Sequence, residues 1–315
     1  MPVPSAYRCE VINSDRDQTE AIDILRGHVG DTEIIGVSRP QGGWGNLSIK
    51  IDTAIGSFIV TKCTARTEAD VRDMADLLID LESFDFPSPR LVPHRDGRVV
   101  SEWRDFPALV KRFIVGTTPK GIVENDPSEF GEIVARLHLA TNGHEIQRPH
   151  EFGRKAFPDA KPLAASDPVA AWLMTMHDRI ESAIDLTLPT GLVHGDLTVD
   201  NLVRSPGGSL SIIDFEEMCR ETLLFDLGMI VFTLAEADQW SDDLESSAVV
   251  GYERVRRLTT AEKEAVPLFV SYAATAIAFV RYRERRIHGG TRVAEGAWTV
   301  PQRIADAAWV RFAGS

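Results

Sequence analysis

The sequence predicts an α+β fold with a strand-rich N-terminal part, residues 1–115, and a mainly helical C-terminal part, residues 116–315. In the first part, short apolar segments alternate with period two and are separated by Gly-rich turns, which is the pattern of strands. After Gly116 the apolar positions recur with the 3.6-residue period of helices over long segments. A chain of 315 residues is also long enough for two parts of ordinary domain size.

The N-terminal part is predicted to contain one short helix, a strand run, a second helix and a strand pair. The second helix must end before Phe86-Pro87-Ser88-Pro89, because the residue before a proline is disfavoured in helical conformation. In chain order the expected elements are a helix at 19–28, strands at 33–37, 47–51 and 57–63, a helix at 68–83, and strands at 98–103 and 108–114.

The C-terminal part is predicted to be built from helices with one apolar face. They are expected at residues 128–141, 167–186, 227–237 and 265–286. His138 lies on the apolar face of the first of these helices. We expect it to be a core histidine with satisfied hydrogen bonds rather than a catalyst.

Composition excludes some classes of protein. With 43% hydrophobic and 26% charged residues, the chain resembles a soluble globular protein. Its net charge of −13 disfavours nucleic acid as a partner, because phosphate backbones attract basic surfaces. We expect no membrane partner, since no apolar run approaches the roughly 18 residues of a membrane span. Three widely spaced cysteines and the lack of a secretory signal predict reduced thiols in the cytoplasm.

The segment 192–217 contains the side chains that phosphoryl transfer requires. His194 and Asp196 form an H-x-D motif, and Asn201 follows five residues after Asp196. Asp214 comes directly after the short apolar run 210–213, and a hairpin at Gly207-Gly208 would return it beside the other two. One carboxylate can orient the attacking hydroxyl, while a second carboxylate and an amide oxygen hold Mg²⁺. The alternative is an acidic surface turn, which Asp and Asn also favour.

A Gly-rich loop between the first two predicted strands is a candidate phosphate-binding loop. It contains Gly42, Gly43 and Gly45, followed by Asn46. Glycine allows backbone amides to approach phosphate oxygens closely. Most Gly-rich hairpins are only turns. The phosphate-binding role of this loop is supported by its position upstream of the H-x-D segment.

In the third predicted strand, 57–63, the segment Ile59-Val60-Thr61-Lys62 resembles the V-A-I-K segment of protein kinases, and this resemblance implies a lysine for the nucleotide phosphates. Side chains alternate along a strand, so Val60 and Lys62 share a face. By the same resemblance, that face would place Val60 near an adenine and Lys62 near the phosphates; a solvated lysine at the end of a strand is the alternative. A register shifted by one residue would put Thr61 there instead. Glu68, Asp70 and Asp73 are three possible acidic partners of the lysine.

These motifs resemble the protein-kinase-like superfamily, in its aminoglycoside phosphotransferase and choline kinase branch. Protein kinases have H-R-D-x-x-x-x-N and D-F-G, where this chain has His194-Gly195-Asp196, Asn201 and Asp214-Phe215-Glu216. No A-P-E follows, and Asp226 comes a dozen residues after Asp214, so there is no room for a peptide-substrate platform.

The resemblance implies a two-lobed kinase-like fold and the cofactors ATP and Mg²⁺. It implies that Asp196 is the catalytic base and that Asn201 and Asp214 are the metal ligands. The nucleotide would be bound by the Gly-rich loop, Val60 and Lys62. Four further residues would support the site: His194, Asp200, Glu216 and Asp226.

The second half is similar to bacterial type II homoserine kinases. The similarity includes Leu137-His138-Leu139-Ala140, then Gly143 with Arg148-Pro149, then Gly251-Tyr252 and the segment from Arg257 to Glu262. It implies homoserine as the acceptor. Another amino-alcohol or antibiotic phosphotransferase is the alternative, and a catalytically silent pseudokinase that binds a partner is a second one. The sequence does not indicate an oligomeric state.

Overall fold

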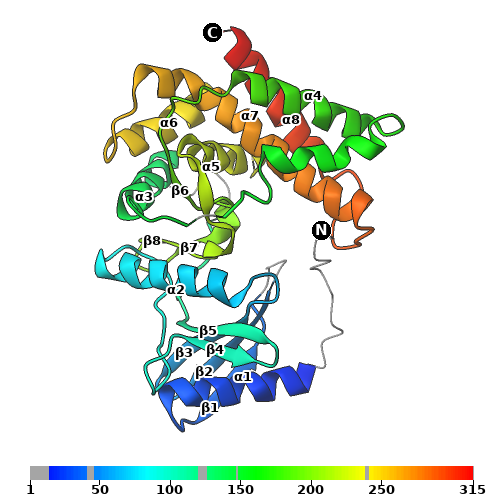
Figure 1. The fold of residues 1–315 in the computed structure, drawn as a ribbon. Helices are drawn as coiled ribbons and strands as arrows, with labels where there is room; N and C mark the ends of the chain where they lie inside the picture. The colour runs from blue at the N-terminus through cyan, green and yellow to red at the C-terminus, as the bar shows by residue number, and fades with distance from the viewer. Residues whose placement is uncertain (1–13, 41–45, 120–125, 147, 238–240, 315) are drawn as a thin grey trace. The chain divides into compact units, whose positions relative to one another are not determined.

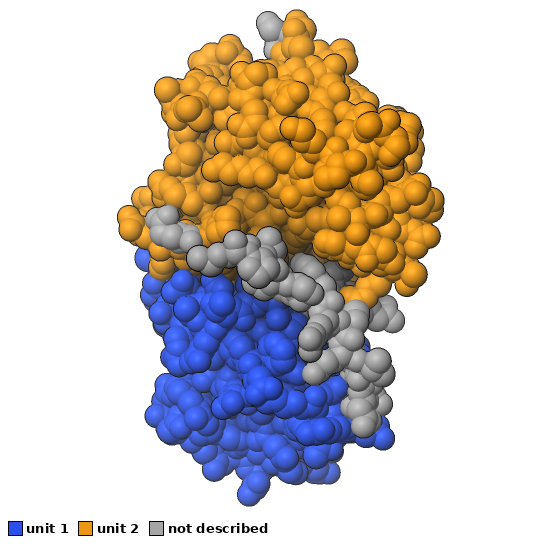
Figure 2. All heavy atoms as spheres, turned by 45° about the vertical axis from the view of Figure 1, so that its right-hand side comes forward, with its two compact units in different colours: residues 1–116, 205–213 blue, residues 117–204, 214–315 orange. Residues whose placement is uncertain are grey.

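The computed structural model describes residues 14–40, 46–119, 126–146, 148–237 and 241–314. The chain forms two compact units (Figure 2). Unit 1 comprises residues 1–116 and 205–213, and unit 2 comprises residues 117–204 and 214–315. Segment 205–213 therefore belongs to unit 1, although the predicted division places it in the C-terminal part. The predicted α+β class is confirmed, with the large sheet in unit 1 and most helices in unit 2.

Unit 1 is built on a five-stranded antiparallel sheet of order β1-β2-β3-β5-β4. The strands are β1 (Ile34–Ser38), β2 (Leu47–Thr53), β3 (Gly56–Lys62), β4 (Val100–Trp103) and β5 (Phe106–Arg112). All five lie within two residues of their predicted bounds. A short strand, β8 (Leu210–Ile212), also belongs to this unit, and the Ile212 amide donates to the carbonyl oxygen of Pro87 at 2.9 Å.

Two helices cover opposite faces of this sheet (Figure 1). Helix α1 (Ser14–Val29) packs Ala21 and Leu25 against Ile51 and Val60, all of them fully buried. Helix α2 (Glu68–Ser83) has the bounds that the sequence predicts. It begins at Thr67, whose side chain accepts from the Asp70 amide in a capping box that satisfies the first orphan amides.

Unit 2 is a packed group of helices. They are α3 (Pro127–Ala140), α4 (Pro168–Ala183), α5 (Leu224–Ala237), α6 (Asp242–Glu253), α7 (Thr260–Tyr282) and α8 (Thr299–Gly314), with the 3-10 segment η1 (Arg154–Leu163) before α4 and the π-helical segment η4 (Arg283–Ile287) after α7. Asp126 and Asp167 cap α3 and α4, each followed by a proline at the first helical position. Helices α6 and α8 were not predicted, because their buried positions include several alanines and a glycine and give a weak apolar signal.

Several short elements of unit 2 flank segment 194–217 or lie within it. They are β6 (Thr190–Val193), η2 (Val199–Asn201), β7 (Leu202–Arg204), η3 (Phe215–Glu217) and β9 (Cys219–Thr222). Strands β6 and β9 form an antiparallel pair. The segment 194–217, which contains the predicted motifs, lies between these two strands in the sequence.

Helix α7 is the central core helix of unit 2, and it packs against α5 and α8. Among the described residues, the stretch Thr260–Ile287 is one helix long and apolar enough to cross a membrane by length and composition. However, 83% of its most apolar window is buried inside the protein, so core packing accounts for its composition.

Candidate active site

The chain leaves β6 through His194 and Gly195 and reaches Asp196. Gly195 has a φ of 81°. A Cβ atom at this position would lie 2.5 Å from the backbone carbonyl oxygen of Glu217. Both the left-handed backbone and the close contact require glycine, so the middle position of the H-x-D motif is decided by local geometry.

A tight loop folds Asn201 back onto Asp196. The Thr198 amide donates to the Asp196 carbonyl oxygen at 2.8 Å, and the Asn201 amide donates to Thr198 at 3.0 Å. The Asn201 side-chain Nδ2 donates to the Asp196 carbonyl oxygen at 2.7 Å and to Oδ2 at 3.1 Å. Because Nδ2 faces Asp196, the acceptor atom Oδ1 of Asn201 faces away from it.

Asp214 has an exposed side chain in a strained backbone conformation. Its φ of 66° and ψ of 61° are left-handed, which Asp tolerates better than most residues. The next residue, Phe215, is buried, and its ring lies 5.1 Å from the buried His194 ring between centroids. This ring contact joins the Asp214 segment to the Asp196 segment within unit 2.

The site has a strongly negative electrostatic character. Burial, together with the nearby carboxylates Asp214 and Glu217, raises the pKa of Asp196 to about 8. The exposed Asp200 adds to the repulsion, while the Asn201 hydrogen bond opposes it. A cation placed here would relieve this repulsion.

Asp226, at the start of α5, anchors the backbone before Asp196. Its fully buried carboxylate accepts from the His194 amide at 2.7 Å, the Gly195 amide at 3.1 Å and His138 Nε2 at 3.1 Å. Burial would raise the pKa of this carboxyl. The His138 hydrogen bond and the two nearby histidines outweigh burial and lower the pKa below its ordinary value, so Asp226 is ionised.

The region of the chain that contains this geometry matches a protein-family model. Residues 36–264 match the model of the phosphotransferase enzyme family. The chain belongs to that family. It is therefore a small-molecule phosphotransferase, and its segment 194–217 lies inside the matched region.

The phosphotransferase is similar in sequence to curated homoserine kinases. That of Gluconacetobacter diazotrophicus is 30% identical over 247 residues, which cover 75% of this chain and 77% of the relative. That of Caulobacter vibrioides is 31% identical over 246 residues, covering 73% and 75%.

Solved structures share the fold at lower identity. A microcompartment-associated aminopropanol kinase has a TM-score of 0.69 at 20% identity, covering 92% of this chain and 95% of that one. The amicoumacin kinase hAmiN, in complex with AMP-PNP, Ca²⁺ and amicoumacin, has a TM-score of 0.69 at 14% identity, covering 94% of each chain. These neighbours confirm the protein-kinase-like fold.

The donor set of the phosphotransferase fits Mg²⁺. Among the described residues no group of three His, Cys, Asp or Glu side chains forms a ready-made metal cluster. Mg²⁺ is commonly bound by one or two carboxylates together with substrate phosphates, so a two-residue protein site is sufficient. The Asp214 carboxylate and the outward-facing Oδ1 of Asn201 are two such oxygen donors.

The structure places the side chains of Val60 and Lys62 in the nucleotide lobe, while their role toward a nucleotide stays a prediction. They share a face, as expected, but it is the face that packs against α1, where Val60 is fully buried. Lys62 is also buried, with its Nζ 4.5 Å from the centre of the Phe106 ring. Helix α2 covers the opposite face of the sheet, so Val60 and Lys62 lie on the α1 side of it (Figure 1).

Thr61, the alternative at this position, lies on the α2 face of β3. It is paired with Ser48 of β2, and the two hydroxyl oxygens are 3.0 Å apart. Of the three acidic residues considered as lysine partners, Glu68 pairs with Arg72 and Asp70 belongs to the capping box of α2.

The predicted Gly-rich loop is only partly described. Gly42, Gly43 and Gly45 lie outside the described residues. Asn46 is described, and its Oδ1 accepts from the Thr64 amide at 2.7 Å. This bond joins the start of β2 to the end of β3, so Asn46 supports the strand pair that flanks the loop.

The structure also describes the predicted supporting residues Glu216 and Asp200. The Glu216 carbonyl oxygen accepts from Arg148 at 2.8 Å, so the arginine of the R-P motif holds the backbone after Asp214. Asp200 is exposed in η2. Sequence reasoning had not assigned this role to Arg148, although the R-P motif marked its position.

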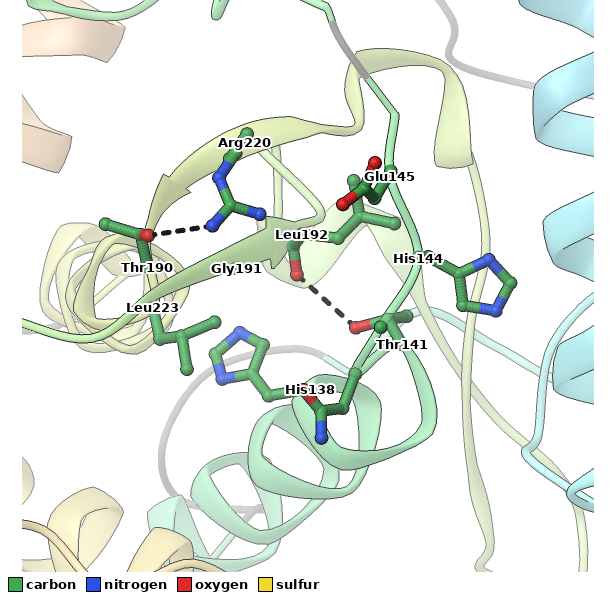
Figure 3. Close-up of a pocket in the computed structure, with 11 residues that line it drawn as sticks. His138, Thr141, His144, Glu145, Thr190, Gly191, Leu192, Arg220 and Leu223 are labelled. Carbon is green, nitrogen blue, oxygen red and sulfur yellow. Dashed lines mark hydrogen bonds between the residues drawn. The ribbon is translucent and has the colours of Figure 1, made fainter.

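A cavity of about 240 Å³ lies beside β6 and the C-terminal end of α3 (Figure 3). Thr141 donates to the Leu192 carbonyl oxygen at 3.4 Å on one side, and Arg220 donates to Thr190 at 3.3 Å on another. Asp196 does not line this cavity. The cavity is therefore separate from the Asp196 carboxylate, the group that would receive the acceptor hydroxyl.

Proposed function

We propose that this phosphotransferase transfers the γ-phosphoryl group of ATP to a hydroxyl of a small amino-bearing molecule, with homoserine the leading acceptor. The observation that supports the reaction best is the arrangement of Asp196, Asn201 and Asp214, in which the first two are hydrogen-bonded and the third raises the pKa of the first. Similarity to curated homoserine kinases supports the acceptor.

In the proposed reaction the acceptor hydroxyl oxygen attacks the γ-phosphorus. The bond from that phosphorus to the β–γ bridging oxygen breaks, ADP leaves, and the hydroxyl proton passes to Asp196. Asp196 Oδ2 accepts from Asn201, so we assign Oδ1 to the hydroxyl. Because such transition states are loose, positioning of the hydroxyl contributes more than proton removal.

Asp214 and Asn201 would hold Mg²⁺, which neutralises charge developing on the phosphates. A bound cation would also relieve the repulsion from Asp214 and Glu217, which adds to the effect of burial on the pKa of Asp196, and so would favour the ionised carboxylate that can accept a proton. We expect the protein to act in the cytoplasm, where its buried cysteines, Cys63 and Cys219, stay reduced.

The test is an ATP-consumption assay with purified protein and Mg²⁺ over homoserine, other hydroxy-amino acids, choline and aminoglycosides. Homoserine should give the highest kcat/KM, and Asp196→Asn should abolish that signal. A preference for choline or an aminoglycoside would refute homoserine as the acceptor but would still support phosphoryl transfer to a small molecule. Absence of turnover together with Mg²⁺-independent nucleotide binding would instead identify a pseudokinase.

The second candidate acceptor class is an amino alcohol or an amine-bearing antibiotic. It is supported by the structural neighbours, whose titles include an aminopropanol kinase, an amicoumacin kinase and a spectinomycin phosphotransferase. Homoserine and amino alcohols share an amine near a primary hydroxyl but differ in the carboxylate. A comparison of homoserine with its decarboxylated analogue, 3-amino-1-propanol, therefore separates homoserine from an amino alcohol as the acceptor.

A further inference from the structure

We propose that Tyr252 and His138 are positioning residues for phosphoryl transfer. Together they form a buried chain of hydrogen bonds that orients Asp226 and, through it, the backbone leading to Asp196. The inference rests on the proposed function for its kinetic readout. It goes beyond that function because neither residue contacts the reacting groups.

The chain is continuous from α6 to the H-x-D segment. Tyr252 Oη lies 2.8 Å from His138 Nδ1, and His138 Nε2 lies 3.1 Å from Asp226 Oδ2. Asp226 in turn accepts from the amides of His194 and Gly195. The side chains of His138 and Asp226 are fully buried, and Tyr252 is fully buried as a residue, so water does not compete for these bonds.

For a neutral His138 ring, the two ends of the chain allow only one direction of donation. The ionised Asp226 carboxylate only accepts, so His138 must carry its proton on Nε2. His138 Nδ1 then accepts from the Tyr252 hydroxyl. Arg256, which only donates, supplies a hydrogen bond to Tyr252 Oη at 3.3 Å. Burial raises the pKa of Tyr252, so this hydroxyl keeps the proton that selects the His138 tautomer.

The packing of α3 against α6 holds Tyr252 and His138 at this separation. A Cβ at Gly131 of α3 would lie 1.9 Å from the Ala248 carbonyl oxygen, and one at Gly251 would lie 1.8 Å from the Ser128 carbonyl oxygen. The two helix backbones are therefore in direct contact at both glycines. Close backbone contact leaves little freedom to change the distance between the two side chains.

The far end of the chain is also fixed. Arg256 pairs with Glu262 at 2.7 Å, and the Glu262 side chain is 1% exposed. Glu262 also closes the capping box of α7 with Thr259. The chain thus begins at the start of the central core helix and ends at the backbone before Asp196.

Tyr252→Phe tests the proposal because it removes one hydroxyl and keeps the ring. His138 then loses the donor that selects its tautomer, and Asp226 loses a fixed partner. We expect kcat to fall about fivefold, the effect of one hydrogen bond, with the KM for ATP unchanged. Hydrogen–deuterium exchange of the His194 and Gly195 amides should quicken by a similar factor.

The matched control is Tyr282→Phe. Tyr282 is also fully buried, and its hydroxyl donates to Asp167 at 3.0 Å in a different part of unit 2. We expect this variant to lose similar thermal stability while kcat and exchange at the two amides stay at wild-type values. If the two variants change kcat and the exchange of the two amides equally, Tyr252 contributes only to stability, and the proposal is overturned.

His138 supplies a second, independent test by rescue. His138→Gln keeps an N–H near the position of Nε2, whereas His138→Leu removes it. The Gln variant should regain most of the exchange protection and kcat that the Leu variant loses; identical behaviour of the two would refute the role of the donor. If the wild-type protein has no turnover, the proposed function fails, but the exchange experiment still decides whether the chain holds the loop.

Discussion

Replacement of Gly195 by alanine is the sharpest test of how the active-site loop is built. The variant must hold a non-Gly residue at a φ of 81°, which costs about 1–2 kcal/mol for an L-residue. Its Cβ would also lie 2.5 Å from the carbonyl oxygen of Glu217. Backbone atoms must move to relieve that overlap, and overpacking of this kind costs about 1–3 kcal/mol. Together these give a loss of about 2–5 kcal/mol in the free energy of unfolding.

The Gly195→Ala change should also displace Asp196, the next residue. A shift of about 1 Å in a positioned group can cost on the order of 10² in rate, so kcat should fall by about that factor. Denaturant unfolding measures the stability and steady-state kinetics measures the turnover. Nucleotide affinity should change little, because Gly195 is followed by Asp196, the proposed base, and not by a proposed phosphate-binding residue.

Gly143→Ala is the matched control. Gly143 has a φ of 91°, but a Cβ there would meet nothing within 4 Å. It should therefore cost only the backbone term of about 1–2 kcal/mol and leave kcat unchanged. If the two variants lose the same stability and both keep full turnover, the close contact between Gly195 and Glu217 does not constrain the loop, and the reasoning is refuted.

Four further outcomes are expected. Asp196→Asn should keep ATP binding and lose turnover by about 10²–10⁴-fold, as for a positioned base; calorimetry and steady-state rates check this. Asp214→Asn should make nucleotide protection against thermal unfolding less dependent on Mg²⁺. Lys62→Met should lower stability and leave the KM for ATP unchanged, whereas Thr61→Val should raise that KM. The pKa of Glu221 falls to about 2, because the His150 and Arg154 contacts outweigh burial. The ionised Glu221 should therefore stabilise the fold at pH values above its unfolded pKa. This contribution to the free energy of unfolding should disappear as the pH falls from about 4.5 to about 2.

Each of these outcomes has a contrary result. Near-normal rates in Asp196→Asn would reject the catalytic base. An unchanged Mg²⁺ response in Asp214→Asn would reject the metal ligand. A raised KM for ATP in Lys62→Met would indicate that Lys62 contacts the nucleotide after all. The pH prediction is checked with Glu221→Gln: its stability deficit against wild type should be present at pH 6 and should shrink below pH 4, and a deficit that stays constant across this range contradicts it.

The contact between Asp196 and Asn201 could be predicted from the sequence because the two residues are close together in the chain. Asp196 and Asn201 are connected by a five-residue loop, and local hydrogen bonds determine how that loop folds. Helix α2 was predicted to the residue because its start signal, Thr67 with Asp70, is a local one. Such signals depend on neighbouring residues, so they do not need the rest of the fold.

The surroundings of Val60, Lys62, His138 and Tyr252 were decided only by the tertiary structure. Alternation shows which residues of β3 share a face, but only the position of α1 shows that Val60 and Lys62 lie on the face that this helix packs against. His138 and Tyr252 are 114 residues apart, and they meet because the backbones of α3 and α6 touch at Gly131 and Gly251. A contact of this kind depends on how helices pack, and packing is a property of the whole core that no local pattern in the sequence records.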